Sequence, residues 1–322
     1  MVEAAVGPEL SVVIPAYNEE ESVVPMYERL VAALDNVVDS LEILYVDDGS
    51  QDQTWREIGE LATRDDRVRG LRFARNFGHQ AALTAGVDAA RGRAIVIIDA
   101  DLQDPPEVIP EMVAKWRNGA EVVYGQRQER EGETVFKKTT AAGFYRLLAR
   151  ITNVEIPVDT GDFRLMGPRA IEAFRALPER NRFIRGLVSW IGFRQEAVGY
   201  RREARFAGDT KYPLRKMIRF ALDGITSFSF LPLRLATMLG FIVSLFSFVY
   251  ILIVIILKLL GINWPGYTSM MASILFLGGV QLVMIGILGE YIARIFDEVK
   301  RRPLYLVGDS TDGETGVVPP ER

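Results

Sequence analysis

The sequence predicts an α/β domain with a mostly parallel sheet, followed by an amphipathic segment and two membrane-crossing helices. Short apolar runs alternate with amphipathic stretches of helical period over residues 10–125, the order of elements in a doubly wound sheet. Two long uncharged stretches follow in the last third of the chain. The 322 residues, 49% of them hydrophobic, suffice for one sizeable domain and something more.

Apolar runs predict the strands, and amphipathic stretches predict the helices between them. The expected strands are Leu10–Ile14, Ile43–Val46, Val68–Phe73, Ala94–Ile98 and Val122–Tyr124. The expected helices lie near Glu20–Val37, Gln53–Thr63, His79–Ala90 and Pro106–Asn118. Pro106 suits the first turn of the last of these, where a missing N–H costs nothing.

The alternation breaks between Gln126 and Asp162. Within that stretch Ala141–Thr152 predicts a short amphipathic helix. The residues from Phe163 onward predict further helix, with a strand near Glu196–Tyr200.

The uncharged stretches have the length of membrane spans. Leu235–Leu257 would form a helix of roughly 35 Å, and Ser269–Leu288 is the expected core of a second. Trp264 and Tyr267 fall between them, as interfacial aromatic residues do. Basic residues flank the outer ends: Arg215, Lys216, Arg219 and Arg234 before, and Arg294, Lys300, Arg301 and Arg302 after. Positive-inside bias therefore predicts that both termini and the α/β domain are cytosolic.

The segment before the first span predicts an interfacial helix. Leu214–Phe230 places apolar residues at helical spacing with basic residues between them. The expected division is 1–212 for the α/β domain, 213–232 for the amphipathic segment, 233–290 for the two-helix membrane domain and 291–322 for a cytosolic tail. Small residues from Gly278 to Gly286, with Gln281 among them, favour a homo-oligomer formed through the membrane helices. The first ten residues lack the basic and apolar regions of a secretory signal.

Composition narrows the chemistry. The chain has no cysteine and one histidine, His79, so thiolate nucleophiles and cysteine-based metal sites are excluded. A metal would be held mainly by oxygen, which indicates Mg²⁺ or Mn²⁺. His79 is expected to be structural or peripheral. Net charge is only −4, but seven basic residues lie within 201–219, which favours contact with anionic lipid or a lipid phosphate. We expect no nucleic-acid partner.

Paired carboxylates follow the fourth predicted strand. Asp99 and Asp101 are two residues apart, so in extended backbone they lean toward one face. Two like charges held so close favour a bound cation, and the carboxyl ends of parallel strands form the ligand crevice of such sheets. We therefore expect a divalent metal that holds a diphosphate. A simple polar turn is the alternative for this motif taken alone.

The ends of the first two strands should face the same crevice. Tyr17 could stack on a flat base, and Glu19 and Asp48 could accept hydrogen bonds from base or ribose. The sequence contains no phosphate-binding P-loop, and no Gly-x-Gly-x-x-Gly follows the first strand. Neither ATPase nor nicotinamide chemistry is therefore suggested.

Five motifs in order resemble one enzyme family. They are Ile14-Pro-Ala-Tyr-Asn-Glu-Glu20, Val46-Asp-Asp-Gly-Ser50, Asp99-Ala-Asp-Leu-Gln-Asp-Pro-Pro106, Thr160-Gly-Asp-Phe-Arg-Leu-Met166 and Gly208-Asp-Thr-Lys-Tyr-Pro-Leu214. The chain resembles family 2 glycosyltransferases of the GT-A fold over about residues 10–307. Within them it is similar to polyprenyl-phosphate glycosyltransferases related to dolichol-phosphate mannose synthase, above all bacterial undecaprenyl-phosphate glucosyltransferases with two C-terminal membrane helices.

The resemblance implies a role for each matched position. Contacts to the donor's base and ribose are implied for Pro15, Tyr17, Glu19, Val46 and Asp48. The metal and diphosphate motif comprises Asp99, Asp101 and Gln103, with Ala100 contributing backbone, and Arg127 lies near the phosphates. Arg205 and Lys211 would meet donor or lipid phosphate, and Asp162 would be the catalytic acid–base carboxylate, with Asp159 as the alternative.

The implied acceptor allows a chemical check on Asp162. A phosphate monoester has a second pKa of about 6 and is largely a dianion at pH 7. A strong base is then less necessary than for a sugar hydroxyl. We expect Asp162 to orient the acceptor or shield developing positive charge as much as it takes a proton.

The resemblance implies inverting transfer of a hexose from a nucleotide sugar, with UDP-glucose as the expected donor, to polyprenyl phosphate at the bacterial plasma membrane. UDP-N-acetylglucosamine, GDP-mannose and a UDP-arabinose derivative are alternative donors. A processive polysaccharide synthase is disfavoured because no Gln-x-x-Arg-Trp motif is present. Two competing functions stay open: a non-catalytic membrane scaffold, and a metal-dependent phosphoryl or nucleotidyl transferase, which two carboxylates would also serve.

Overall fold

The computed structural model describes residues 7–128, 160–180, 182–203, 231–261 and 266–313. The chain divides into two compact units. Residues 1–213 and 302–322 form one, and residues 214–301 form the other. The predicted helix at Ala141–Thr152, most of the predicted amphipathic segment, Asp159, Arg205 and Lys211 lie outside the described residues.

An eight-stranded sheet forms the centre of the first unit, in the order β7-β5-β6-β4-β1-β2-β3-β8. The strands are β1 (Leu10–Ala16), β2 (Leu41–Asp47), β3 (Val68–Phe73), β4 (Ala94–Ile97), β5 (Val122–Arg127), β6 (Thr160–Met166), β7 (Gln195–Tyr200) and β8 (Val307–Ser310). Strands β4, β1, β2 and β3 are parallel to one another, β6 runs antiparallel between β4 and β5, and β8 runs antiparallel to β3. The predicted mostly parallel α/β sheet is confirmed.

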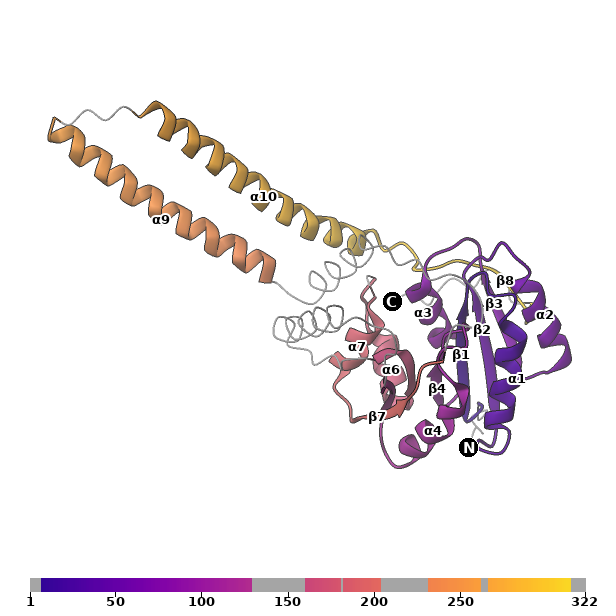
Figure 1. Ribbon diagram of the computed structural model, residues 1–322. Coiled ribbons are helices and arrows are strands. Elements are labelled where there is room, and N and C mark those ends of the chain that lie inside the picture. Colours follow the sequence, from indigo (N-terminus) through magenta and orange to yellow (C-terminus); the bar gives the residue numbers. More distant parts are fainter. Residues whose placement is uncertain (1–6, 129–159, 181, 204–230, 262–265, 314–322) are drawn as a thin grey trace, which may run out of the picture. The chain divides into compact units, whose positions relative to one another are not determined.

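Helices cover both faces of this sheet (Figure 1). They are α1 (Val23–Leu34), α2 (Thr54–Arg64), α3 (His79–Ala89), the 3₁₀ turn η1 (Pro106–Val108), α4 (Ile109–Arg117), α6 (Pro168–Ala176) and α7 (Ile184–Ile191). Alternate residues of β1 serve the two faces, as the pleat requires. Val12 and Ile14 join the core under α1, whereas Val13 packs so closely on α3 that a side chain at Gly86 would overlap it.

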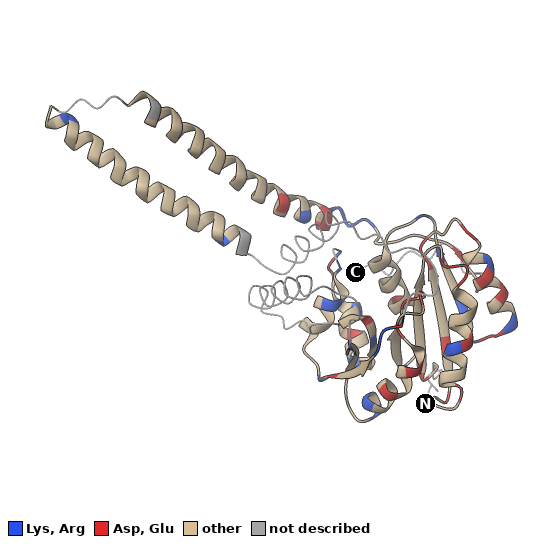
Figure 2. Ribbon diagram, viewed as in Figure 1, with Lys and Arg blue, Asp and Glu red and all other residues tan. Residues whose placement is uncertain are grey.

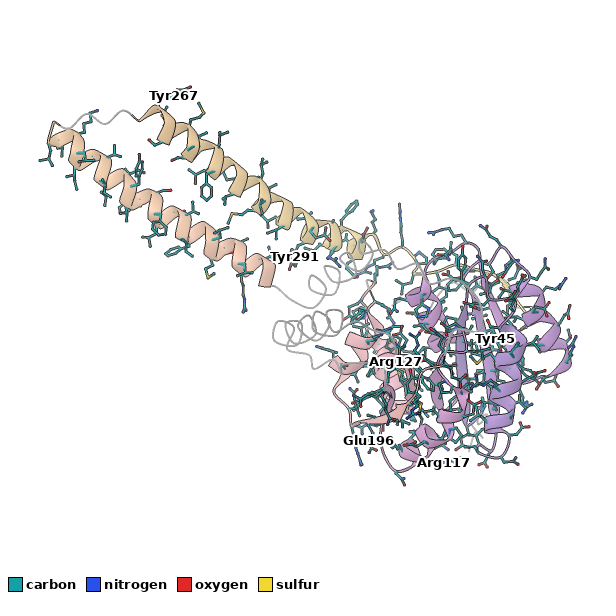
Figure 3. The ribbon with its side chains drawn as sticks, in the orientation of Figure 1. Tyr45, Arg117, Arg127, Glu196, Tyr267 and Tyr291 are labelled. Carbon is teal, nitrogen blue, oxygen red and sulfur yellow. The ribbon has the colours of Figure 1, made fainter. Side chains whose placement is uncertain are left out.

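The buried Tyr45 hydroxyl in this core is hydrogen-bonded to backbone. Tyr45 on β2 is fully buried, and its hydroxyl donates to the Val23 carbonyl oxygen at 2.9 Å (Figure 3). That bond fixes the start of α1 against the sheet, because an unpaired buried hydroxyl would be costly.

Strand β6 differs from the sequence prediction, which placed helix from Phe163 onward. All seven residues of β6 are buried, including Asp162 and Arg164. These two charged side chains interrupt the apolar run by which a buried strand is predicted from sequence. Burial is tolerated because the Arg164 guanidinium donates to the carbonyl oxygens of Gly161 and Asp162 at 3.0 and 3.3 Å.

The residues that follow α10 return to the sheet, within the stretch 291–322 that was expected to form a cytosolic tail. Strand β8 pairs with β3, and Tyr305 stacks on Phe73 with ring centroids 5.1 Å apart. The Asp312 carboxylate accepts from Arg69 Nε at 2.6 Å. Pairing and stacking thus cover an edge strand that would otherwise be open.

The second unit contains two long helices, α9 (Leu231–Leu259) and α10 (Tyr267–Lys300). Both are long and apolar enough to cross a membrane, by length and composition. Charged residues lie near both ends of α9 and near the C-terminal end of α10, and most of each helix is uncharged (Figure 2). A side chain at Gly240 of α9 would lie 3.0 Å from the Met284 methyl group of α10, so the two helices approach closely there.

Candidate active site

The loops that follow β1 and β2 are tied together by backbone-to-side-chain hydrogen bonds. Asn18 N–H donates to Ser50 Oγ, and Gln51 N–H donates to Asn18 Oδ1, both at 2.9 Å. Glu19 N–H donates to Thr54 Oγ1 at 2.9 Å. Asn18 has a φ of +54°, which asparagine tolerates better than most residues. These bonds make one fixed edge out of two loops.

The predicted nucleoside contacts divide into exposed and buried residues along this edge. Tyr17 is 43% exposed, so its ring is accessible for stacking on a base. Glu19 is partly exposed and accepts from Ser22 Oγ at 2.9 Å. Pro15 and Val46 are buried and paired in register on adjacent strands. Any contact from these two would come through the backbone at the strand ends.

Asp48 holds the loop that opens α3. Its Oδ1 accepts from the Phe77 and Gly78 N–H groups at 2.7 and 3.2 Å, and its Oδ2 accepts from Gly78 at 2.9 Å. Burial raises the pKa of Asp48 despite these bonds. Gly78 has a φ of +102°, which favours glycine, and His79 follows it as the first residue of α3. Asp48 therefore determines where His79 lies.

The carboxylate loop after β4 contains a carboxylate with one buried oxygen. Asp99 Oδ1 is buried and has no hydrogen-bond partner among the described residues. Burial, together with the nearby carboxylates of Asp162, Asp104 and Asp101, raises the pKa of Asp99 to about 6 against the opposing effect of His79. Leu102, just after Asp101, has a φ of +58°, a strained conformation for leucine.

This loop fits a divalent cation bound jointly with a ligand. The described residues offer no cluster of three or more His, Cys, Asp or Glu side chains that could hold a metal ion. Mg²⁺ is commonly held by one or two carboxylates plus substrate phosphates, and an Asp99 oxygen that accepts no hydrogen bond from the described residues suits that arrangement. Asp101 Oδ1 accepts from the Gln103 N–H at 3.2 Å, which keeps the loop compact.

Asp162 is buried and contacted by Arg185 and His79. Arg185 Nε and Nη2 donate to its two oxygens at 2.9 and 3.1 Å, and His79 Nε2 lies 3.3 Å from Oδ2. Burial alone would raise the pKa of Asp162, but Arg185, His79 and Arg164 hold it well below its usual range. Asp162 is therefore a fixed anion beside the carboxylate loop.

His79, expected to be structural or peripheral, lies between two of the predicted site carboxylates. Its Nε2 lies 3.6 Å from Asp99 Oδ1 as well as beside Asp162, so it bridges the carboxylate loop and β6. Burial lowers the pKa of His79, but the two carboxylates outweigh that effect and the pKa is raised. His79 follows the loop at the carboxyl end of β3, and β3 is parallel to β1 and β2. That position in the sequence could have predicted that His79 lies near the other strand ends.

Arg127 lies at the end of β5, near a further buried carboxylate. Its Nη2 is 3.8 Å from Asp104 Oδ1, and its Nε donates to the Tyr200 hydroxyl at 3.2 Å. Ala100 is buried within the carboxylate loop. Sequence patterns assigned no role to Asp104, Arg185 or Tyr200. Asp104 stands inside the Asp99–Pro106 motif, whereas no local pattern marks Arg185.

Comparison with known families identifies the chain. The model of glycosyl transferase family 2 matches residues 11–174. The chain belongs to glycosyltransferase family 2. The GtrB C-terminal hairpin matches residues 231–295, which contain α9 and most of α10 of this glycosyltransferase. The resemblance drawn from the five motifs is thereby confirmed.

Relatives match this glycosyltransferase over nearly its whole length. The "Uncharacterized glycosyltransferase YkcC" of Bacillus subtilis (strain 168) is 51% identical, covering 93% of both chains. The "Bactoprenol glucosyl transferase" of Shigella phage SfII is 45% identical, covering 94% of this chain and 99% of that one. A crystal structure of glucosyl-3-phosphoglycerate synthase from Mycobacterium tuberculosis with Mn²⁺, UDP-glucose and phosphoglyceric acid is similar at 22% identity and a TM-score of 0.48, covering 68% of this chain and 78% of that one.

Proposed function

We propose that this glycosyltransferase moves glucose from UDP-glucose to undecaprenyl phosphate, with inversion, at the cytosolic face of the bacterial plasma membrane. The bactoprenol glucosyl transferases, at about 45% identity over nearly the full chain, support the donor and acceptor. The observation that carries the chemistry is the pair of carboxylates at the crevice. Asp99 has an oxygen that accepts no hydrogen bond from the described residues, whereas both oxygens of Asp162 accept from Arg185.

On the donor side the loops after β1 and β2 would hold the nucleoside. Tyr17 would stack on the base, and Glu19 would accept from base or ribose. Asp48 would support the adjoining loop through its bonds to Phe77 and Gly78. Asp99, Asp101 and Gln103 would hold Mg²⁺ or Mn²⁺ together with the diphosphate. When bound, such a cation offsets the negative charge that grows on the leaving nucleotide.

On the acceptor side the lipid phosphate is its own nucleophile. One phosphate oxygen forms a bond to the anomeric carbon while the bond from that carbon to the UDP oxygen breaks, and UDP leaves with the electron pair. Attack from the face opposite UDP converts an α-linked donor to a β-linked product. Since a phosphate monoester is largely a dianion at pH 7, no proton need be removed.

Asp162 suits orientation and charge stabilisation better than proton acceptance. A carboxylate whose pKa lies well below its usual range is a weak base. Its fixed negative charge would instead stabilise positive charge that develops at the sugar ring. Arg185 and His79 would keep that charge in place.

The two apolar helices would anchor the enzyme with both termini in the cytosol. Arg205 and Lys211, in the segment that precedes them, would meet donor or lipid phosphate. A homo-oligomer formed through these helices stays a prediction.

The direct experiment is transfer of radiolabelled glucose from UDP-glucose to undecaprenyl phosphate by the purified full-length protein with Mn²⁺ or Mg²⁺. We expect metal-dependent labelled lipid, lost in Asp101→Ala. Asp39→Ala is the matched control. Asp39 is exposed and precedes β2, so it lies at the amino ends of the parallel strands, away from the carboxylate loop. Transfer from another nucleotide sugar alone would change the donor. Binding of nucleotide without transfer from any donor would favour a scaffold.

A further inference from the structure

A second cluster of charged groups surrounds Asp104, and the proposed reaction leaves it unused. Asp104 is fully buried at the end of the carboxylate loop. The Tyr200 hydroxyl donates to its Oδ1, while its Oδ2 is buried without a hydrogen-bond partner among the described residues. A buried carboxylate with one unsatisfied oxygen is costly unless cations lie close to it.

Two arginines supply that positive charge. Arg127 Nη2 and Arg202 Nε each lie 3.8 Å from Asp104 Oδ1. Their side chains are 18% and 34% exposed, so both extend from the buried carboxylate toward solvent. Two guanidinium groups beside one carboxylate leave a net positive charge next to the loop that would hold the diphosphate. Neither distance is a hydrogen bond, so Asp104 attracts both groups without fully engaging them.

The sheet register brings these groups together. Arg127 and Tyr200 are partners in the parallel pairing of β5 with β7. Gly161 on β6 makes room for the guanidinium, because a Cβ there would lie 2.8 Å from Arg127 Nη2. The Arg127 side chain is thus confined between a strand neighbour and a glycine.

Separate contacts fix the segment that carries Arg202. The N–H of Glu203 donates to the Gln103 carbonyl oxygen at 3.0 Å, which ties this segment to the carboxylate loop. The Glu203 carboxylate accepts from Arg29 of α1 at 3.0 and 3.1 Å, and Arg29 also binds Glu107 at 2.6 and 2.8 Å. The contacts of Glu203 therefore fix the backbone next to Arg202 beside the predicted diphosphate motif.

We propose that Arg202 is a phosphate-binding residue of the crevice, and that Asp104 is a positioning residue that aims Arg202 and Arg127 at the bound phosphate. The proposal rests on the proposed function, since it takes nucleotide and lipid phosphate as the two ligands. An arginine offers a planar fork of donors that matches phosphate oxygens, and a buried carboxylate behind it sets the direction of the fork. The ligand chemistry is a phosphate group, from either the donor diphosphate or the lipid.

The test compares UDP with uridine, which lacks the phosphates, on the full-length protein. We would measure both dissociation constants by calorimetry with Mn²⁺, and KM for undecaprenyl phosphate at saturating UDP-glucose. If the phosphate is the donor's, Arg202→Met raises the UDP dissociation constant about tenfold and leaves uridine unchanged. If it is the lipid's, KM for the lipid rises about tenfold instead. Either result supports the proposal.

Asp104→Asn should weaken phosphate binding in the same way as Arg202→Met. Arg202→Lys should weaken it less than Arg202→Met, because lysine keeps the positive charge but lacks the planar fork of donors. Arg194→Met is the matched control, since Arg194 is 64% exposed and adjoins the opposite end of β7. Arg202→Met is informative even if Asp104→Asn fails to fold. Unchanged UDP and lipid constants in Arg202→Met, or an equal loss for UDP and uridine, would overturn the proposal. Absence of glucose transfer by the wild type would instead refute the proposed function.

Discussion

The two halves of the crevice satisfy their polar groups in different ways. On the β1–β2–β3 side the side chains at the strand ends bind neighbouring backbone, as in the Asn18–Ser50 bond and the three N–H bonds to Asp48. On the β4–β6–β5–β7 side, Asp99 and Asp104 each keep a buried oxygen without a hydrogen-bond partner among the described residues.

Asp47 is a partial exception on the first side. Its Oδ2 also has no hydrogen-bond partner in the described part of the chain, but Arg72 Nε lies 3.4 Å from it and compensates its charge. The β1–β2–β3 side, the proposed nucleoside half, therefore has its buried carboxylates compensated before a ligand arrives. The β4–β6–β5–β7 side is the proposed phosphate half. Its Asp99 and Asp104 each have a buried oxygen that accepts no hydrogen bond from the described residues, and a bound cation with its phosphate would compensate their charge.

The largest expected effect comes from Asp99→Asn. Activity should fall roughly 100- to 1000-fold, because a preorganised charge at the diphosphate is lost. In metal-free buffer the same change should raise Tm by about 2–4 °C, since the folded protein already disfavours the Asp99 anion. Glucose transfer and thermal melting in EDTA measure the two effects. A lower Tm would show that the phosphate half is not strained by charge.

Asp162→Asn should lower kcat about 100-fold, through loss of a fixed charge. The loss should be equally deep above and below a pH of about 6, where the acceptor phosphate titrates. The reason is that the pKa of Asp162 is held well below its usual range, so the wild-type side chain is ionised throughout. The measurement is kcat as a function of pH for the wild type and for Asp162→Asn. Recovery of the variant at high pH would indicate proton transfer to Asp162.

Tyr305→Ala tests whether the completed nucleoside half depends on the C-terminal strand. Tyr305 is 3% exposed and stacks on Phe73, whose ring meets Phe77 edge-on beside the loop held by Asp48. We expect the free energy of unfolding to fall by about 3 kcal/mol. Leu306→Ala is the control, because Leu306 is 44% exposed. Equal effects of the two variants in denaturant titrations would contradict a specific role for the stacked ring.

Asp65→Asn should have the smallest effect. Hydrogen bonds from Arg67, and then from Tyr27, lower the pKa of Asp65. A lowered folded-state pKa adds stability that is present above the unfolded pKa of about 3.9 and is lost as pH falls further. We expect about 1 kcal/mol of destabilisation at neutral pH, shrinking in acid. Unfolding curves at several pH values test this. A difference that grows in acid would have the wrong sign.

Sequence patterns predicted β1, β2 and β4 from mostly apolar runs, and β3 from apolar residues that Arg69 and Arg72 interrupt. Strand β6 was missed because Asp162 and Arg164 interrupt its pattern while being buried. The carboxylate motif and Asp162 were found from local spacing and resemblance. His79, Arg185 and Arg202 enter the site through contacts between distant segments, such as Arg185 of α7 on Asp162 of β6. No local pattern encodes such a contact.

The proposed nucleoside half has its polar groups satisfied without a ligand, and the proposed phosphate half does not. The most direct measurement is calorimetric binding of uridine and of UDP to the wild-type protein, each with EDTA and with Mn²⁺. We predict that the uridine dissociation constant is the same in both buffers, whereas UDP binds about tenfold or more tightly with Mn²⁺. Equal tightening of uridine and UDP by Mn²⁺, or no tightening of UDP, would contradict the claim.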